Sequence, residues 1–194
     1  MKIDMLLLSR HGTRATGILH YNAVLLTQAR TAVHRLVHAA HADFRYAQAV
    51  GPHLRHVLDH YRAFMTGLQH APDILIRYDV RDRNLSLQSQ PTVAIAHLTS
   101  MELELRLCAD RPSPAWDMDT PVQVVAQAGL QGEFELSTSS TLGRELLFLS
   151  SHTVHHFALV AHYCKAAGVE LGVDFGKAPA TVAYERMVEA HACA

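Results

Sequence analysis

The residues best suited to chemistry in this 194-residue chain are its histidines, of which there are fifteen. In the segment SSHTVHHFALV, His152 and His156 are four residues apart. On a helix this spacing places both imidazoles on one face, one turn apart, where they can bind a single metal ion. Some pairs at this spacing arise by chance, as with His34 and His38, and such side chains can equally be solvated or hydrogen-bonded in a core. The spacing alone is therefore a weak indication of a metal site.

Two further features favour a site. His152 and His156 lie within a mainly apolar stretch, where an imidazole without a polar partner costs free energy. The segment PHLRHVLDHYRAF also places His53, His56 and His60 along one stripe of another predicted helix. A third imidazole from a facing helix would complete three ligands and leave one position open, which is typical of catalytic rather than structural metal sites. On a helical wheel, His53 and His60 lie nearer the apolar stripe than His56.

The elements that must position these histidines are long helices. Apolar residues recur with a period near 3.6 in four segments, which predicts helices over residues 18–41, 52–68, 91–108 and 142–167. Gly168 follows the last of them, where a left-handed residue is expected. Pro52 suits the first turn of the second helix because its missing N–H would be unpaired there anyway.

The remaining segments are shorter. Residues 70–90 are expected to form a partly extended link, and residues 121–138 alternate around a Gly-Leu-Gln-Gly centre, which predicts a hairpin. A turn at residues 176–179 precedes a last short helix. We therefore expect an all-α fold: a four-helix bundle with a short β-hairpin before the last long helix. It would be a single domain over residues 1–194, with residues 1–17 as an N-terminal extension.

GPHLRHVLDHYRAF, followed later by RELLFLSSHTVHHFALV, resembles the DinB/YfiT-like helical-bundle proteins. The segments YDVRDRN and DFGKAPATVAYER also look like a bacterial branch of that family. The resemblance implies a divalent metal bound by one histidine of the second helix and the pair of the last long helix. Here these are His56, His152 and His156, with His60 as the fallback. His56 is preferred because an apolar pair and an aspartate, Val57-Leu58-Asp59, follow it as in the family.

The resemblance also implies a function. Family members with assigned chemistry are often metal-dependent transferases or isomerases that use low-molecular-weight thiols. We accordingly expect a metal-dependent S-transferase or hydrolase that uses Zn, Ni or Fe and acts on a small molecule with such a thiol. The alternative is a non-catalytic metal- or ligand-binding stress-response protein that acts through a partner. A homodimer is expected, since family members often dimerise and the chain has a surplus of apolar residues.

Other polar residues are candidates to support the site. Glu145 lies seven residues before His152 and Asp59 lies near the histidines of the second helix, so either could accept a ligand's second N–H. An ordinary surface role for Glu145 is at least as well supported. The link arginines Arg77, Arg81 and Arg83 could form an anion-binding patch. Surface ion pairs with Asp79 and Asp82 are the preferred interpretation, because such pairs are common and weak.

A different motif lies near the start of the chain. RHGTR, with Arg10, His11 and Arg14, resembles the phosphate pocket of histidine phosphatases. Those enzymes place the motif directly after a strand of a doubly wound sheet, whereas this chain is expected to continue as helices. The phosphatase remains a remote alternative.

Composition limits partners and compartment. A net charge of −1 gives no general attraction to nucleic acid, and the apolar runs are too short for a membrane span or a secretory signal. The chain has three cysteines, Cys108, Cys164 and Cys193, and none of them forms a CxxC pair. This odd number suggests free thiols in a reducing compartment. The protein is therefore expected in the cytoplasm. Metal binding is expected to weaken below about pH 6.5, because imidazoles must be neutral to bind.

Overall fold

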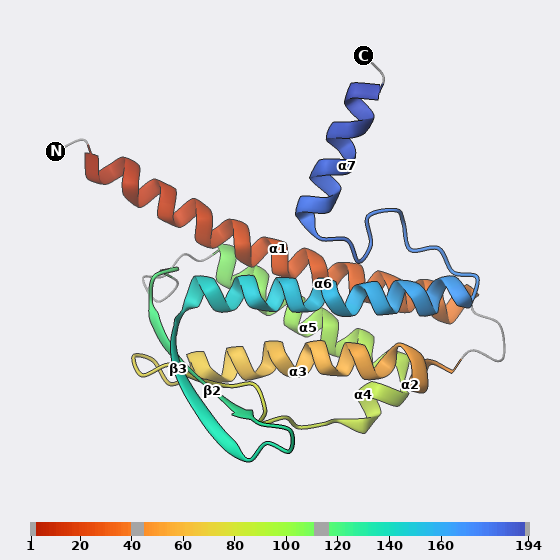
Figure 1. Ribbon diagram of the computed structural model, residues 1–194, viewed down its shortest axis with the longest axis horizontal. Helices are drawn as coiled ribbons and strands as arrows, with labels where there is room; N and C mark the ends of the chain where they lie inside the picture. The colour runs from red at the N-terminus through yellow and green to blue at the C-terminus, as the bar shows by residue number, and fades with distance from the viewer. Residues whose placement is uncertain (1–2, 40–44, 111–116, 193–194) are drawn as a thin grey trace.

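The computed structural model describes residues 3–39, 45–110 and 117–192, and for residues 3–14 it describes the backbone alone. Figure 1 shows the arrangement of these elements. In chain order they are α1 (Ile3–Ala39), α2 (Tyr46–Ala49), α3 (Gly51–Leu68), β1 (Leu75–Arg77), α4 (Leu85–Ser89), α5 (Pro91–Asp110), β2 (Pro121–Ala128), β3 (Phe134–Thr141), α6 (Leu142–Ala166) and α7 (Pro179–Ala192).

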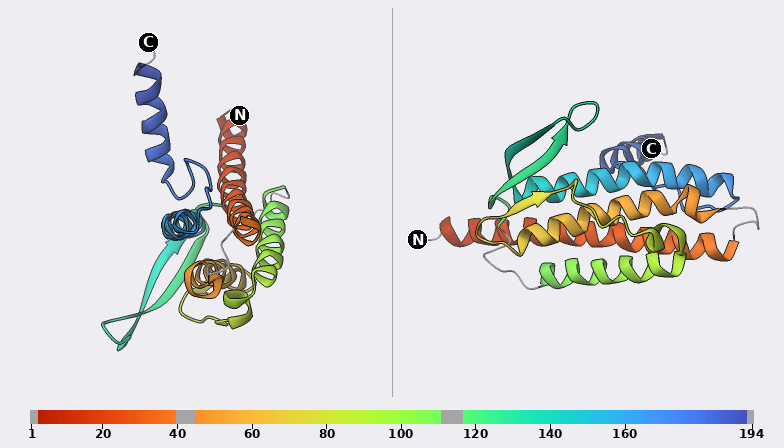
Figure 2. Two further views of the ribbon diagram at one scale, coloured as in Figure 1. Left: turned by 90° about the vertical axis from the view of Figure 1, so that its right-hand side faces the viewer. Right: turned by 90° about the horizontal axis from the view of Figure 1, so that it is seen from below.

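Four long helices lie side by side and enclose the core (Figures 1 and 2). Helices α1 and α3 each contact both α5 and α6. The inward faces of all four helices carry fully buried apolar side chains at helical spacing, among them Leu26, Val33, Leu58, Phe64, Leu98 and Phe157. Burial of this stripe stabilises the helices far more than their intrinsic propensity does.

A three-stranded mixed sheet lies at one end of these helices and overturns the expected fold class. The predicted hairpin is confirmed: β2 pairs antiparallel with β3, in register from Pro121 opposite Thr141 to Ala128 opposite Phe134. A further strand, β1, pairs parallel with β2, with Ile76 opposite Val124. The chain is therefore mainly α with a sheet, and the expectation of an all-α four-helix bundle is wrong. A parallel pair requires a long crossover, which α4 and α5 supply.

The bounds of α3, α5 and α6 follow the predicted ones to within two residues. The predicted end of the first helix, residues 40–41, lies outside the described residues, and the short helices α2 and α4 were not predicted. Helix α1 begins at Ile3, so most of the expected extension, residues 1–17, is helical and continuous with the first long helix. Helix α6 begins as predicted: the Thr141 side chain accepts a hydrogen bond from the Arg144 N–H and caps the first turn. At its other end Gly168 has a φ of 74°, the predicted left-handed conformation.

A buried polar chain joins the helices that carry the candidate site. The Tyr61 hydroxyl on α3 donates to Asn22 Oδ1 on α1 at 2.7 Å. Asn22 Nδ2 donates to the Leu146 carbonyl of α6 at 3.2 Å, and the Thr153 hydroxyl of α6 donates to the Tyr61 oxygen at 3.3 Å. Because buried polar groups must be paired, these bonds set how α3 lies against α6.

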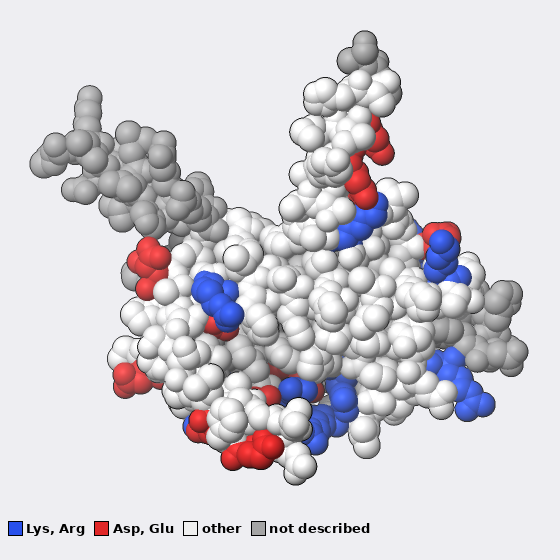
Figure 3. All heavy atoms as spheres, in the orientation of Figure 1, with Lys and Arg blue, Asp and Glu red and all other residues white. Residues whose placement is uncertain are grey.

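On the face shown in Figure 3, the acidic and basic side chains of the described residues are scattered among uncharged ones and form no extended patch of one charge. In the described part of the chain, no helix combines the length and apolarity that crossing a membrane demands.

Candidate metal centre

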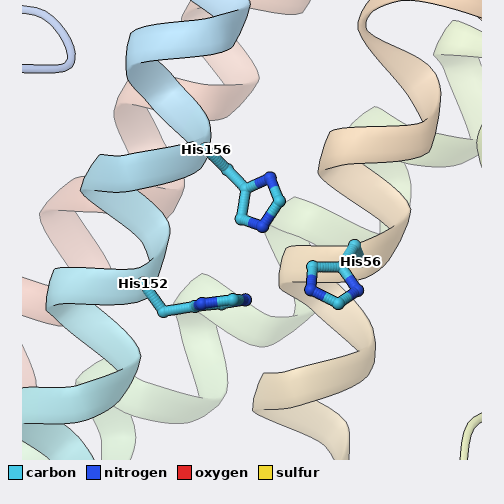
Figure 4. A group of neighbouring side chains, drawn as sticks. All are labelled: His56, His152 and His156. Carbon is cyan, nitrogen blue, oxygen red and sulfur yellow. The ribbon is translucent and has the colours of Figure 1, made fainter. Parts of the chain in front are cut away.

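Three histidines converge between α3 and α6 at mid-helix. One ring nitrogen from each of His56, His152 and His156 lies within 4.8 Å of the other two. Figure 4 shows His152 and His156 extending from successive turns of α6 toward His56 on α3. The spacing of the α6 pair brings both rings to one face, and the packing of α3 against α6 supplies the third. Three imidazoles at this separation surround a point that a single ion, at bond lengths of about 2.0–2.1 Å, can reach after small side-chain adjustments.

Aromatic rings close one side of the cluster. Phe148 stacks on His152 with ring centroids 5.5 Å apart, and Tyr78 stacks on His60 at 5.2 Å. His60 in turn lies 4.3 Å from His152 between ring centroids. These rings restrict the rotamers of His152 and limit its contact with water, which favours a fixed ligand geometry.

The environment keeps the three imidazoles uncharged. Burial lowers the pKa of His56 to about 3, helped by repulsion from His60, His156, Arg81 and His152. Burial and neighbouring histidines likewise lower the pKa of His152 and His156 to about 4. All three are therefore neutral at pH 7, the state in which imidazole binds metal. The prediction that metal binding weakens below about pH 6.5 assumed unperturbed histidines, and the pKa values of these three lie well below that.

The hydrogen bonds of the three rings differ. His156 Nδ1 lies 3.0 Å from His53 Nδ1, so one of these two nitrogens donates to the other. In the tautomer that carries the proton on His156 Nδ1, His156 Nε2 is free to act as a ligand. His152 Nε2 is buried and has no hydrogen-bond partner among the described residues. Such an orphaned nitrogen costs free energy unless something else satisfies it. His56 Nδ1 accepts a hydrogen bond from Arg81 Nη1 at 3.1 Å. A soft or borderline divalent ion fits this all-imidazole donor set.

The other histidines considered as ligands are not grouped with these three. His60, the fallback ligand, is 5% exposed, and its Nδ1–H donates to the His56 carbonyl at 2.9 Å. It borders the cluster but is not one of the three grouped ligands. His155 is exposed on α6, as are His34 and His38, the other pair at the same spacing, on α1.

The two carboxylates considered as supports do not bond a grouped histidine in the described structure. Glu145 is fully buried and accepts hydrogen bonds from Tyr78, Ser140 and Arg144 at 2.8, 2.6 and 2.7 Å. It therefore anchors the 70–90 link to α6. Asp59 is 3% exposed and lies 3.8 Å from Arg62 Nη1, and burial raises its pKa.

The link arginines divide between two roles. Arg81 pairs with Asp79 at 3.4 Å, as the surface interpretation predicts, but it also reaches His56. Arg77 pairs with Glu135 of β3 at 3.0 Å. Arg83 is exposed.

The phosphatase motif lacks the strand it requires. Arg10, His11 and Arg14 fall within helix α1, whose backbone alone is described over residues 3–14. Cys108 and Cys164 are free thiols, and Cys193 lies outside the described residues.

Two residues around the site were not identified from sequence, and a third was identified only as part of a possible anion-binding patch. Tyr78 and Phe148 had no signal beyond their aromatic type, because only the tertiary packing brings them to His60 and His152. Arg81 lies in the charged segment YDVRDRN, but its contact with His56 spans 25 residues of chain and depends on how β1 positions the link. The nearest sequence signal was the density of arginines in a segment expected to be irregular.

Comparison with known proteins gives little guidance. No family model matches the chain. FK506-binding protein 5 from Rhizopus delemar is 26% identical over 108 residues, or 56% of this chain and 27% of that protein. The chain thus spans little more than a quarter of that relative's length, and so distant a partial match does not establish a family. No solved structure matches the chain.

Proposed function

We propose that this protein binds one divalent metal ion through His56, His152 and His156, and that it is a metal-dependent enzyme of the DinB-like class. The carrying observation is the convergence of three neutral imidazoles whose ligand atoms lie within 4.8 Å, one of them with a buried nitrogen that has no partner in the described part of the chain. Two of the three rings come from spacing on one helix and the third from a facing helix, so the cluster forms only in the folded chain.

The chain's own residues supply position and environment. In the tautomer of His156 that presents Nε2 to a metal, Nδ1–H donates to His53, and Phe148 restricts the His152 ring. Three protein ligands leave a tetrahedral ion with one position for a substrate or water. When bound, such an ion lowers the pKa of a thiol or water at that position and so makes it a nucleophile near neutral pH. A thiol-dependent S-transferase or a hydrolase uses this chemistry.

The test of the site is metal content. Untagged protein dialysed against Zn²⁺ should retain about one ion per chain. Changing His56, His152 or His156 to Ala should each weaken Zn²⁺ binding by more than about a hundredfold, beyond the 10–100-fold attributed to outer hydrogen-bond partners. The matched control is His155→Ala, which removes an exposed imidazole from the same helix. Full zinc occupancy in the three variants would refute the site.

The test of the reaction is separate. The zinc-, nickel- and iron-loaded proteins are assayed with a panel of low-molecular-weight thiols and electrophiles, with the metal-free protein as the baseline. A rate that depends on metal and is lost in His152→Ala supports an enzyme. Metal binding without any such rate supports the non-catalytic alternative.

A further inference from the structure

Arg81 donates a hydrogen bond to His56, one of the proposed metal ligands. Its Nη1 lies 3.1 Å from His56 Nδ1. A guanidinium has donors only and stays charged, so Nδ1 must be the acceptor. The neutral His56 ring then carries its own proton on Nε2.

This hydrogen bond and a bond from His56 to a metal exclude each other. If His56 binds through Nδ1, the lone pair that Arg81 uses goes to the ion. If it binds through Nε2, the ring proton must move to Nδ1, where it would face the N–H of Arg81. Either mode therefore requires Arg81 Nη1 to give up His56.

The rest of the Arg81 side chain is held independently. Its Nε donates to the Tyr78 carbonyl at 2.9 Å, and its Nη2 lies 3.4 Å from Asp79 Oδ1. Tyr78 is itself fixed through its hydroxyl to the buried Glu145. The guanidinium therefore keeps its place when the bond to His56 breaks, and one charged donor is left without a partner.

A cavity of about 810 Å³ lies between α3, β1 and the 70–90 link, and Arg81 is one of its lining residues. Ala63, Leu75 and Val80 contribute apolar wall, and the other charged side chains of the lining are Asp59, Arg62, Asp73, Arg77 and Asp82. A cavity of this size takes a small-molecule ligand that is mainly apolar with a few polar groups. The matching partner for a freed guanidinium N–H is a carboxylate.

We propose that this cavity binds a small carboxylic acid with an apolar body, and that Arg81 couples its binding to metal occupancy. The inference depends on the proposed metal site. Without metal, Arg81 bonds His56; with metal, the released donor bonds the carboxylate. Coupling is reciprocal, so the acid must also tighten metal binding.

Zinc affinity without any acid tests the competition. It is measured by competition with a chromogenic chelator for the wild type, Arg81→Met and Arg83→Met. Arg81→Met should bind Zn²⁺ about tenfold more tightly, because a charge-assisted hydrogen bond no longer opposes ligation. Arg83→Met removes the same charge from the same link and should stay within about twofold of the wild type.

Acid binding tests the second half, with 2-naphthoate as the probe and the neutral 2-naphthamide as its control. By calorimetry, zinc-loaded wild type should bind naphthoate at least about tenfold more tightly than the metal-free protein does, and naphthamide should show no such gain. Arg81→Met should lose the gain. A metal-dependent gain that survives in Arg81→Met would place the carboxylate on the ion and overturn the inference.

The two proposals fail in different ways. Zinc binding that is unaffected by His152→Ala, or absent from the wild type, refutes the metal site and the coupling with it. Zinc binding that requires His152 but is no tighter in Arg81→Met refutes the coupling alone.

Discussion

At the residue scale, the hydrogen bonds of the ring nitrogens distinguish the three histidines. His156 has His53 as a hydrogen-bond partner, and His152 Nε2 has none among the described residues. His56 differs from both, because the charged guanidinium of Arg81 donates to it. Metal affinity should therefore depend most on what competes for His56.

Burial of the three histidines makes the stability of the metal-free protein depend on pH. The folded-state pKa values of His56, His152 and His156 lie near 3 to 4, whereas these residues titrate near 6.5 in an unfolded chain. Between these values the unfolded state binds more protons, so stability rises with pH. Acidification from pH 7 toward pH 4 should progressively lower the unfolding temperature.

Thermal unfolding followed by circular dichroism from pH 4 to 8 in a chelator measures this dependence. His152→Gln should reduce the slope of stability against pH by roughly the contribution of one bound proton. His34→Gln, at an exposed position, should leave that slope unchanged. Equal slopes for the wild type and His152→Gln would contradict neutral burial of His152.

At the element scale, strand β1 determines where the link lies. Ile76 is fully buried and pairs with Val124, which fixes the chain two residues before Tyr78 and five before Arg81. Tyr78 then bonds the buried Glu145 of α6. The sheet thus carries a charged, largely exposed segment to the edge of the histidine cluster.

Gly67 permits this packing, because a Cβ there would lie 2.8 Å from the Leu75 carbonyl oxygen and 2.9 Å from Ile76 Cγ1. Gly67→Ala should force β1 away from α3 and lower the free energy of unfolding by about 1–3 kcal/mol. The control is Gly17→Ala on α1, where a Cβ meets nothing within 4 Å. That change should instead stabilise the protein by about 0.5–1 kcal/mol through helix propensity. Chemical denaturation measures both, and a stabilised Gly67→Ala would contradict the close packing.

At the scale of the whole molecule, α7 projects away from the long helices (Figure 1). None of its residues is buried, and Tyr184, Met187 and Val188 expose large apolar side chains. The homodimer inferred from sequence stays a prediction, and sedimentation at tens of micromolar tests it.

Removal of residues 179–194 probes the same helix. If the protein is a monomer, this truncation should shift the unfolding temperature by less than about 2 °C, because α7 adds nothing to the core. A larger fall, together with loss of a sedimenting dimer, would show that α7 packs against a second copy.

Local periodicity determined much of this protein in advance. The bounds of α3, α5 and α6 follow from apolar spacing and from Pro52 and Gly168, because helix signals are contained within a few turns of chain. The hairpin and the common face of His152 and His156 are equally local. For the third histidine, spacing alone left His53, His56 and His60 open.

Tertiary structure decided the rest. Strand β1 is three residues long and pairs with residues 48 positions away, so no periodicity could reveal it. The rotation of α3 against α6, set by packing and by the bonds of Tyr61, brings His56 rather than His60 into the group. The contact of Arg81 with His56 depends on both. Such features arise from the relative placement of distant segments, and the free energy that selects them comes from burying surfaces that no single segment contains.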